Sequence, residues 1–244
     1  MRLSRRITLN CTGIFHKMWH GHNREYVLKA HVDKIEYLKA LSVHFKDEFK
    51  EQLKWHSYCL MGTHPHETGT VKPDENNDLE TGIQKLGNWM RNAHSQFGAA
   101  YNRRYKRRGK VAYDRPKTSE IENQDGLLRV MFYGDVNPVR AGIVSHPSKY
   151  KYSSYRFYAY GEKNEFTDQL TMPACYLALG KTPQQRQKAY RSLCDQYLRE
   201  KGLLDDAPLE MECRFIGSES WQNDRRVALR KSIKNRDGPQ PVPV

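Results

Sequence analysis

The 244-residue sequence has no closely spaced cysteine pair and no long hydrophobic run. Its five cysteines are scattered and odd in number, and no CxxC pair occurs, so neither a disulfide framework nor a zinc finger is expected. The roughly 20 consecutive apolar residues that span a bilayer are also missing, so we expect no membrane partner. MRLSRRITLNCTG carries basic residues with no apolar segment behind them, which predicts a cytoplasmic protein without a secretory signal.

Acidic residues are the minority among the charged residues. Asp and Glu number 28 against 41 Lys and Arg, which gives a net charge of +13. By charge alone, such an excess suits a nucleic acid or an anionic membrane surface, and of these two we expect the nucleic acid. A merely basic soluble protein is the alternative. Hydrophobic residues make up 38% of the chain, with 11% aromatic residues, which can still build a core.

The first third of the chain is expected to alternate between strands and a helix. Residues 13–28 begin as a strand, and residues 31–49 have apolar side chains at helical spacing. Residues 55–61 are aromatic and apolar enough for a second strand. Residues 67–78 are expected to form a polar loop. With the helices that follow, this order predicts an α+β fold in which helices pack on an antiparallel sheet, as in a ferredoxin-like sandwich.

The remaining chain is expected to be mainly helical. Helices are predicted at four places: from about residue 79, over residues 119–136, after Thr182-Pro183, and within residues 215–235. Ser119 and Glu122 form the capping pattern expected at the start of the second. The composition changes near residue 162. We therefore expect a main domain over residues 1–161, a small helical C-terminal extension over 162–236 and a disordered tail over 237–244.

Two histidines stand one residue apart in the stretch YCLMGTHPHETG. Residues i and i+2 of a strand project to the same face, so His64 and His66 could hold one cation while Pro65 points away. Proline would be tolerated at a sheet edge. An exposed loop with incidental histidines is the alternative, because a single H-x-H pattern is common.

Tyr133 and Asn137 in RVMFYGDVNPVRAGIV lie one helical turn apart and could face one site. Asn137 offers a carbonyl oxygen suited to Mg²⁺ or Mn²⁺, and Tyr133 offers a phenolic oxygen that can act as a nucleophile. Pro138 disfavours helical geometry at Asn137, so the helix is expected to end there. A core aromatic on an amphipathic helix is the alternative for Tyr133.

The run YNRRYKRRGK combines a dense positive charge with two tyrosines. Such a run suits contact with a nucleic-acid backbone, and a solvated helix end is the alternative. The basic residues expected to contact DNA are Arg103, Arg104, Lys106, Arg107, Arg108 and Lys110. Tyr101 and Tyr105 are expected to pack or to stack on bases.

Five stretches, in order over about residues 13–160, resemble the HUH single-tyrosine transposases, and most closely their REP-associated branch. They are FHKMWHGHNREYVL, YCLMGTHPH, YNRRYKRRGK, VMFYGDVNPVRAGIV and YKYSSYRFY. The resemblance implies a catalytic domain over residues 1–161 that nicks and rejoins hairpin-bearing single-stranded DNA, as a nucleoid-associated enzyme. It also implies that His64, His66 and Asn137 hold a divalent metal, Mg²⁺ or Mn²⁺, and that Tyr133 forms a 5′-phosphotyrosine.

The resemblance further implies DNA contacts at His22, Asn23 and Arg24. It implies extra DNA contact by the C-terminal extension, for which a stabilising helical cap is the alternative. Members of the superfamily are monomers or homodimers, and both remain open. Two other functions are also open. Pro65 and the following polar run favour a non-catalytic hairpin-binding protein derived from such a transposase, and the histidine pair alone would suit a metal-dependent hydrolase.

Overall fold

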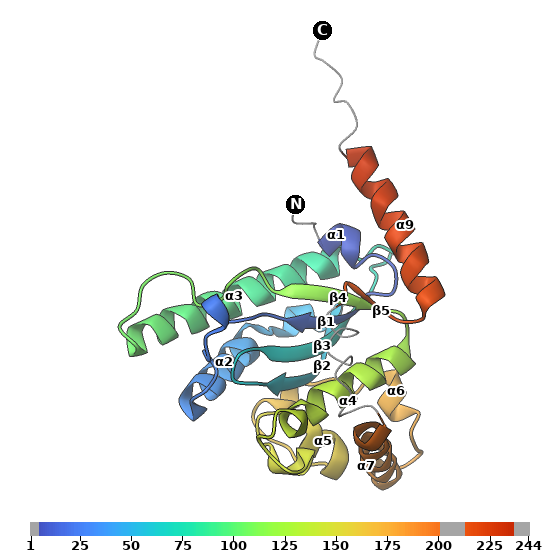
Figure 1. Ribbon diagram of the computed structural model, residues 1–244. Helices are drawn as coiled ribbons and strands as arrows, with labels where there is room; N and C mark the ends of the chain where they lie inside the picture. Colours follow the sequence, from blue (N-terminus) through green and yellow to red (C-terminus); the bar gives the residue numbers. More distant parts are fainter. Residues whose placement is uncertain (1–4, 201–212, 237–244) are drawn as a thin grey trace.

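The computed structural model describes residues 5–200 and 213–236, so the predicted tail at 237–244 lies outside the described residues. A five-stranded sheet forms the middle layer, with helices on both faces (Figure 1). The strand order is β2-β3-β1-β4-β5. The strands are β1 (Ile14–Met18), β2 (Leu53–Leu60), β3 (Pro65–Val71), β4 (Lys117–Ile121) and β5 (Phe215–Ile216). The predicted α+β class is confirmed.

Long helices cover each face of the sheet. On one face lie α2 (His31–His44) and α3 (Glu80–Arg104), and on the other lies α4 (Gln124–Arg140). The remaining helices are α1 (Arg5–Thr8), α5 (Tyr155–Tyr160), α6 (Ala174–Leu177), α7 (Pro183–Glu200) and α9 (Glu219–Arg236), with short 3-10 turns η1 (His22–Arg24), η2 (Asp47–Phe49), η3 (Pro147–Lys149) and η4 (Thr167–Gln169). Within the described residues, no helix is both long and apolar enough to cross a membrane.

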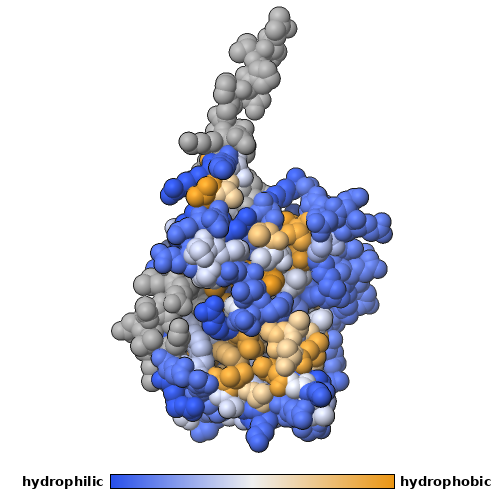
Figure 2. Space-filling model, turned by 90° about the vertical axis from the view of Figure 1, so that its right-hand side faces the viewer, coloured by the Kyte–Doolittle hydropathy of each residue, from blue (hydrophilic) through white to orange (hydrophobic). Residues whose placement is uncertain are grey.

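Each face of the sheet has its own hydrophobic core. Trp55, Trp89 and Phe97 belong to the core under α2 and α3, where they are almost fully buried. Val130 and Tyr190 belong to the core under α4, so α7 packs on the same core as the first 161 residues. Most of the face in Figure 2 is hydrophilic, with hydrophobic residues gathered in its lower half. The domain division at residue 162 stays a prediction.

The polar loop expected over residues 67–78 is wrong for residues 67–71, because β3 continues to Val71, and a loop follows over residues 72–78. The polar side chains of β3 are buried against partners on the neighbouring strands. Glu67 forms an ion pair of 2.9 Å with Lys17 of β1, and Thr68 Oγ1 lies 2.6 Å from Ser57 Oγ of β2. Satisfied polar groups can be buried at little cost, so a polar sequence here does not prevent a central strand.

The predicted helix start at Ser119 is also wrong. Ser119 lies in β4, where its hydroxyl donates to the carbonyl of Cys213. Helix α4 begins at Gln124, and the Asn123 side chain accepts a hydrogen bond of 2.9 Å from the amide of Gly126. Glu122 instead accepts hydrogen bonds from the amide and hydroxyl of Ser218. Asparagine is as good an N-cap as serine, and it takes that position here.

The expected placements of the two prolines near the candidate site need correction. Pro65 is the first residue of β3, which lies between β2 and β1 and is not an edge strand. A proline is tolerated at the first position because the missing N–H does not interrupt the ladder. Pro138 lies inside α4, which continues to Arg140. The amide of Ala141 donates to the carbonyl of Asn137 at 2.9 Å, so helical geometry persists through the expected ligand.

In the described parts of residues 162–236 the structure has the helices α6, α7 and α9 and the short strand β5. This two-residue strand pairs with β4 in parallel, so the sheet is mixed at one edge and antiparallel elsewhere. Helix α7 begins at Pro183, and the hydroxyl of Thr182 accepts a hydrogen bond from the amide of Gln185. Thr182 and Pro183 therefore open a helix as expected.

Candidate functional site

Helix α4 lies close to the sheet where it crosses β2 and β3, and Gly134 marks the place of contact. A Cβ added at Gly134 would lie 3.8 Å from the Cβ of Cys59 and 4.0 Å from the Cβ of His66. Both distances are ordinary van der Waals contacts, so the helix packs directly on the two strands at this position. Because of this close contact, the side chains on either side of Gly134, those of Tyr133 and Asn137, reach His66.

His66 contacts both predicted partners from α4. Its ring centroid lies 5.4 Å from that of Tyr133, with the two rings at 90°. Nδ2 of Asn137 lies 2.8 Å from Nε2 of His66. All three side chains are at least nine-tenths buried, with exposed fractions of 4% for His66, 4% for Tyr133 and 9% for Asn137. A single chain therefore brings together the predicted nucleophile and two of the predicted metal ligands.

His64 lies in the turn that precedes β3 and not on the strand itself. Its ring centroid is 4.7 Å from that of His66. The Nδ1 atom lies 2.8 Å from the Oγ1 of Thr63, which fixes the orientation of the ring. The sequence argument that the two histidines share a strand face is thus wrong for His64, but the turn still places the two rings side by side.

Two further histidines, His16 and His20, lie beside this pair. Nε2 of His16 lies 2.9 Å from Nδ1 of His66, and the two rings are stacked. The rings of His20 and His64 have centroids 5.0 Å apart. His16 is on β1, which pairs directly with β3, so adjacent strands bring these residues together. Only knowledge of the strand pairing could have shown this from the sequence.

The electrostatic environment keeps the two predicted ligands neutral. Burial, reinforced by the nearby His20, lowers the pKa of His64 to about 4. Burial, followed by His64 and His16, lowers the pKa of His66 well below its ordinary value. A neutral imidazole has a lone pair that can bind a metal. At neutral pH both rings are therefore in the protonation state that a metal ligand needs.

Arg140 is the positive charge beside Tyr133. Its Cζ atom lies 5.4 Å from the centre of the Tyr133 ring, one turn beyond Asn137 on the same helix. It is partly buried. A guanidinium binds phosphate oxygens well, so this residue could hold an anionic substrate next to the phenol.

The residue types at this place suit a divalent metal, although the Asn137 atom that faces His66 is the amide nitrogen, and only the amide oxygen could bind a cation. Nδ1 of His66 contacts His16, and its Nε2 faces the Asn137 amide. Nδ1 of His64 contacts Thr63, so Nε2 is the ring nitrogen of His64 that could bind a metal. Two imidazole nitrogens and one amide oxygen suit Mn²⁺ and related ions. Within residues 5–200 and 213–236, no group of three or more His, Cys, Asp or Glu residues has the arrangement of a metal site. The fit thus depends on Asn137 as the third ligand.

The turn predicted to contact DNA lies at the surface. Asn23 and Arg24 are exposed, and both have left-handed backbone conformations, with φ of 53° and 58°. The amide of His22 donates to the carbonyl of Val111 at 2.8 Å, and its ring lies 6.0 Å from that of Tyr113. The structure therefore brings this turn next to the loop that follows the basic run.

Two residues of the basic run form ion pairs with carboxylates, and among the described residues the other four form none. Arg104 pairs with Asp33 at 2.7 Å, and Arg107 pairs with Glu25 at 2.8 Å. These two side chains are held on the protein surface by carboxylates. The other basic residues of the run are all exposed: Arg103, Lys106, Arg108 and Lys110.

The two tyrosines of this run differ in their surroundings. Tyr101 is buried, with an exposed fraction of 8%, so it packs in the core. Tyr105 is 43% exposed, and its hydroxyl donates to Asp33 at 2.7 Å. Only Tyr105 presents a ring that a base could stack on.

The comparisons with known proteins give one structural likeness. The sequence matches no known family description and no curated protein. The fold is similar to a solved structure of a REP-associated tyrosine transposase bound to a REP hairpin, with 18% sequence identity and a TM-score of 0.47. The matched region covers 67% of this chain and 89% of that chain.

Proposed function

We propose that this protein nicks and rejoins single-stranded, hairpin-bearing DNA, with Tyr133 as nucleophile. The observation that carries the proposal is the contact of Tyr133 and Asn137 with His66 in one buried cluster. A phenol, two neutral imidazoles, an amide and a guanidinium at one place suit phosphoryl transfer better than packing alone would require. The net charge of +13 favours a nucleic acid as the substrate.

The reaction is a transesterification. The phenolic oxygen of Tyr133 forms a bond to the phosphorus, the bond from phosphorus to O3′ breaks, and the phenolic proton ends on the released 3′-hydroxyl. His64, His66 and Asn137 would hold a divalent cation, and such a cation supplies positive charge that neutralises a phosphate oxygen. Arg140 would bind a second oxygen. Attack by a 3′-hydroxyl on the phosphotyrosine reverses the step and rejoins DNA, so neither water nor ATP is consumed.

A covalent adduct tests this proposal. Hairpin-bearing single-stranded DNA labelled at its 3′ end is incubated with the protein and Mn²⁺, and the products are separated under denaturing conditions. The label should migrate with the protein, because the 3′ fragment carries the phosphotyrosine. Tyr133→Phe should abolish the adduct, whereas Tyr160→Phe, which changes an exposed tyrosine elsewhere, should not. Equal adduct formation by wild type and Tyr133→Phe would refute the proposal.

The second candidate function is hairpin binding without catalysis. The observation that favours it is the burial of the reacting groups, since Tyr133 is only 4% exposed and the Asn137 amide already contacts His66. Tight hairpin binding without an adduct under any divalent metal would support this candidate.

A metal-dependent hydrolase is less well supported. The carboxylate nearest in sequence to the histidine pair is Glu67, and its Oε1 is bound to Lys17 and Tyr37. It lies in the core between the sheet and α2, on the face away from His66. It therefore cannot act as the base that such a hydrolase needs to activate water. Hydrolysis of a phosphate ester without a tyrosyl intermediate would be the signature of this function.

A further inference from the structure

Helix α3 covers the face of the sheet opposite α4 (Figure 1). A groove runs along this helix. The larger part of the groove is a cavity of about 640 Å³ between residues 87–102 of α3 and the loop at 109–116. A second cavity of about 230 Å³ adjoins it towards the start of the helix. The two cavities share Arg5, Gly87, Arg91 and Arg115, so they form one continuous groove.

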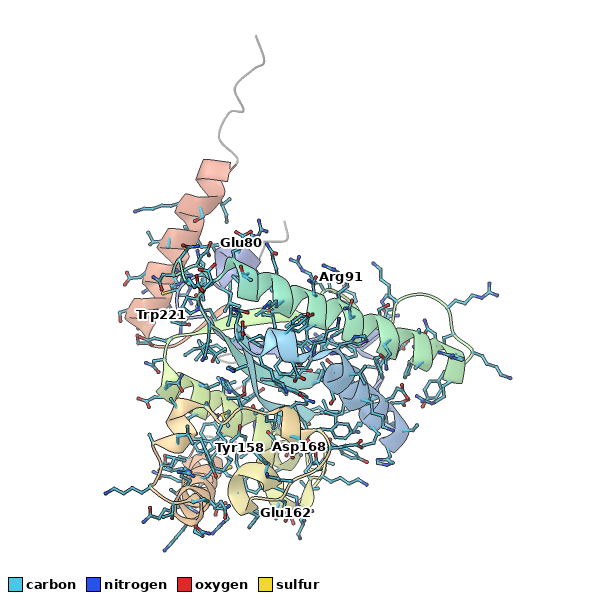
Figure 3. All side chains as sticks on the ribbon, turned by 180° about the vertical axis from the view of Figure 1, so that it is seen from behind. Glu80, Arg91, Tyr158, Glu162, Asp168 and Trp221 are labelled. Carbon is cyan, nitrogen blue, oxygen red and sulfur yellow. The ribbon has the colours of Figure 1, made fainter. Side chains whose placement is uncertain are left out.

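The groove is lined by an excess of positive charge. The basic residues of the larger cavity are Arg5, Arg91, Lys110 and Arg115, and among the described residues that line it Asp114 is the one acidic side chain. Figure 3 labels Arg91 on α3, well separated from the labelled residues of the α4 side of the molecule. Four positive charges against one negative charge in a single cavity favour an anionic ligand.

Arg5 shows most directly that the groove suits an anion. Its guanidinium donates to Thr118 Oγ1 at 2.9 Å and to the carbonyl of Pro116 at 3.3 Å, and among the described residues it has no carboxylate partner. Burial, followed by repulsion from Arg115, lowers the pKa of Arg5 to about 10. A cation that is partly buried beside another cation is unfavourable unless an anion joins them.

The groove reaches the corner of the molecule where the candidate site lies. The amide of Tyr113, which lines the groove, donates to the carbonyl of His20 at 2.9 Å. The ring of His20 in turn lies 5.0 Å from that of His64. The predicted DNA contacts at His22 and Lys110 lie along the same path, because His22 is bonded to Val111 of this loop. A linear polyanion could therefore occupy the groove and continue to the candidate site.

We propose that this groove binds the phosphate backbone of a single-stranded segment of the DNA substrate, with Arg91 and Arg115 as direct phosphate ligands. The proposal rests on the proposed function for the identity of the anion. It assigns a second DNA-binding surface, separate from Tyr133 and on the opposite face of the sheet. Residues 87–102 of α3 extend over about 22 Å, which provides length for several successive phosphates.

Salt-dependent binding tests the proposal. The probe is a fluorescent 30-nucleotide oligothymidylate, and anisotropy gives its Kd between 50 and 300 mM NaCl. Arg91 and Arg115 are exposed, so Arg91→Gln and Arg115→Gln should leave the fold intact. Together they should weaken binding at least about tenfold and reduce the slope of log K against log salt by about 1.4, since each lost phosphate contact removes about 0.7. The matched control is Lys188→Gln on α7, which should stay within twofold of wild type.

A double variant with the affinity and salt slope of wild type would overturn the proposal. A cross-linking experiment gives an independent result, with 4-thiothymidine placed along the same oligonucleotide. Cross-links should fall within residues 87–116, and their confinement to other parts of the chain would also overturn the proposal.

The failure of the proposed function is distinguishable from the failure of this inference. If wild type forms no adduct at Tyr133 but the double variant loses oligothymidylate binding, the groove is supported and the nicking reaction is not. If the adduct forms and the double variant binds oligothymidylate normally, the nicking reaction is supported and the groove is not. An oligonucleotide too short to reach the groove should give equal adduct with wild type and with the double variant.

Discussion

Nδ2 of Asn137 lies 2.8 Å from Nε2 of His66, across the contact between helix α4 and strand β3. The two residues are 71 positions apart in the chain, and both are buried. Buried polar groups of this kind need partners, and here each is the partner of the other. A metal held by these same two residues would need the amide oxygen of Asn137 in place of Nδ2, so the amide would turn when a metal binds.

Asn137 is predicted to be essential for the reaction and not for the fold. Asn137→Ala should lower the rate of adduct formation at least about 100-fold, because one of the groups that stabilises charge is lost. The protein should remain folded, since Asn137 lies in the last turn of α4. Adduct rates and circular dichroism check this. A variant with wild-type rates would show that Asn137 has no part in the reaction.

His16 is predicted to be a positioning residue for His66. It contacts Nδ1 of His66 at 2.9 Å, and loss of such a contact to a metal-ligating histidine lowers metal affinity by about 10- to 100-fold. His16→Phe should therefore raise the Kd for Mn²⁺, as measured by calorimetry without DNA.

A variant with a polar group at position 16 provides the control for this effect. His16→Gln, which restores a polar atom near the ring, should recover part of the affinity. If both variants bind Mn²⁺ as wild type does, His16 has only a packing role.

The buried ion pair of Lys17 with Glu67 is predicted to be strongly coupled. Both side chains have an exposed fraction of 0%, and the hydroxyl of Tyr37 donates to Glu67 at 2.7 Å. Lys17→Met alone leaves a buried carboxylate without its cation and should cost about 3–5 kcal/mol of the free energy of unfolding. Adding Glu67→Gln should recover part of that loss. Urea unfolding of the two single variants and the double variant measures the coupling, and strictly additive losses would contradict it.

His56 is predicted to make the stability depend on pH. Burial lowers its pKa to about 4, and its ring is held by the carbonyl of Thr171 and the hydroxyl of Thr70. The unfolded chain then binds a proton that the folded chain does not, so the free energy of unfolding should fall as pH decreases from 6.5 to 4. The contribution of His56 should reach at most about 3 kcal/mol.

The comparison of wild type with His56→Gln isolates this contribution from those of the other buried histidines. The variant should lose less stability than wild type over the same pH range in urea titrations. Equal losses for the two proteins would show that His56 does not supply the effect.

The spacing of residues along the sequence predicted the part of the candidate site that lies on helix α4. Tyr133 and Asn137 are one helical turn apart, and the helix places both against His66. The polar residues of β3 could not be recognised as a strand, because their partners Lys17 and Ser57 come from other strands. The position of His16 beside His66 depends on strand order for the same reason.

The groove along α3 could not be predicted from the sequence. Arg5 and Arg115 are 110 positions apart, and neither belongs to the basic run that the sequence analysis identified. Neither residue stands in a motif. Only the pairing of the chain into a sheet, with α1 against β4, brings them to one cavity.

The most direct test of the account is the identity of the tyrosine that becomes linked to DNA. After the adduct is formed with Mn²⁺ and the DNA is trimmed by nuclease, trypsin releases the peptide VMFYGDVNPVR, whose one tyrosine is Tyr133. Mass spectrometry should find the nucleotide on this peptide. A nucleotide found instead on an exposed tyrosine such as Tyr105 or Tyr113, with Tyr133 unmodified, would contradict the account.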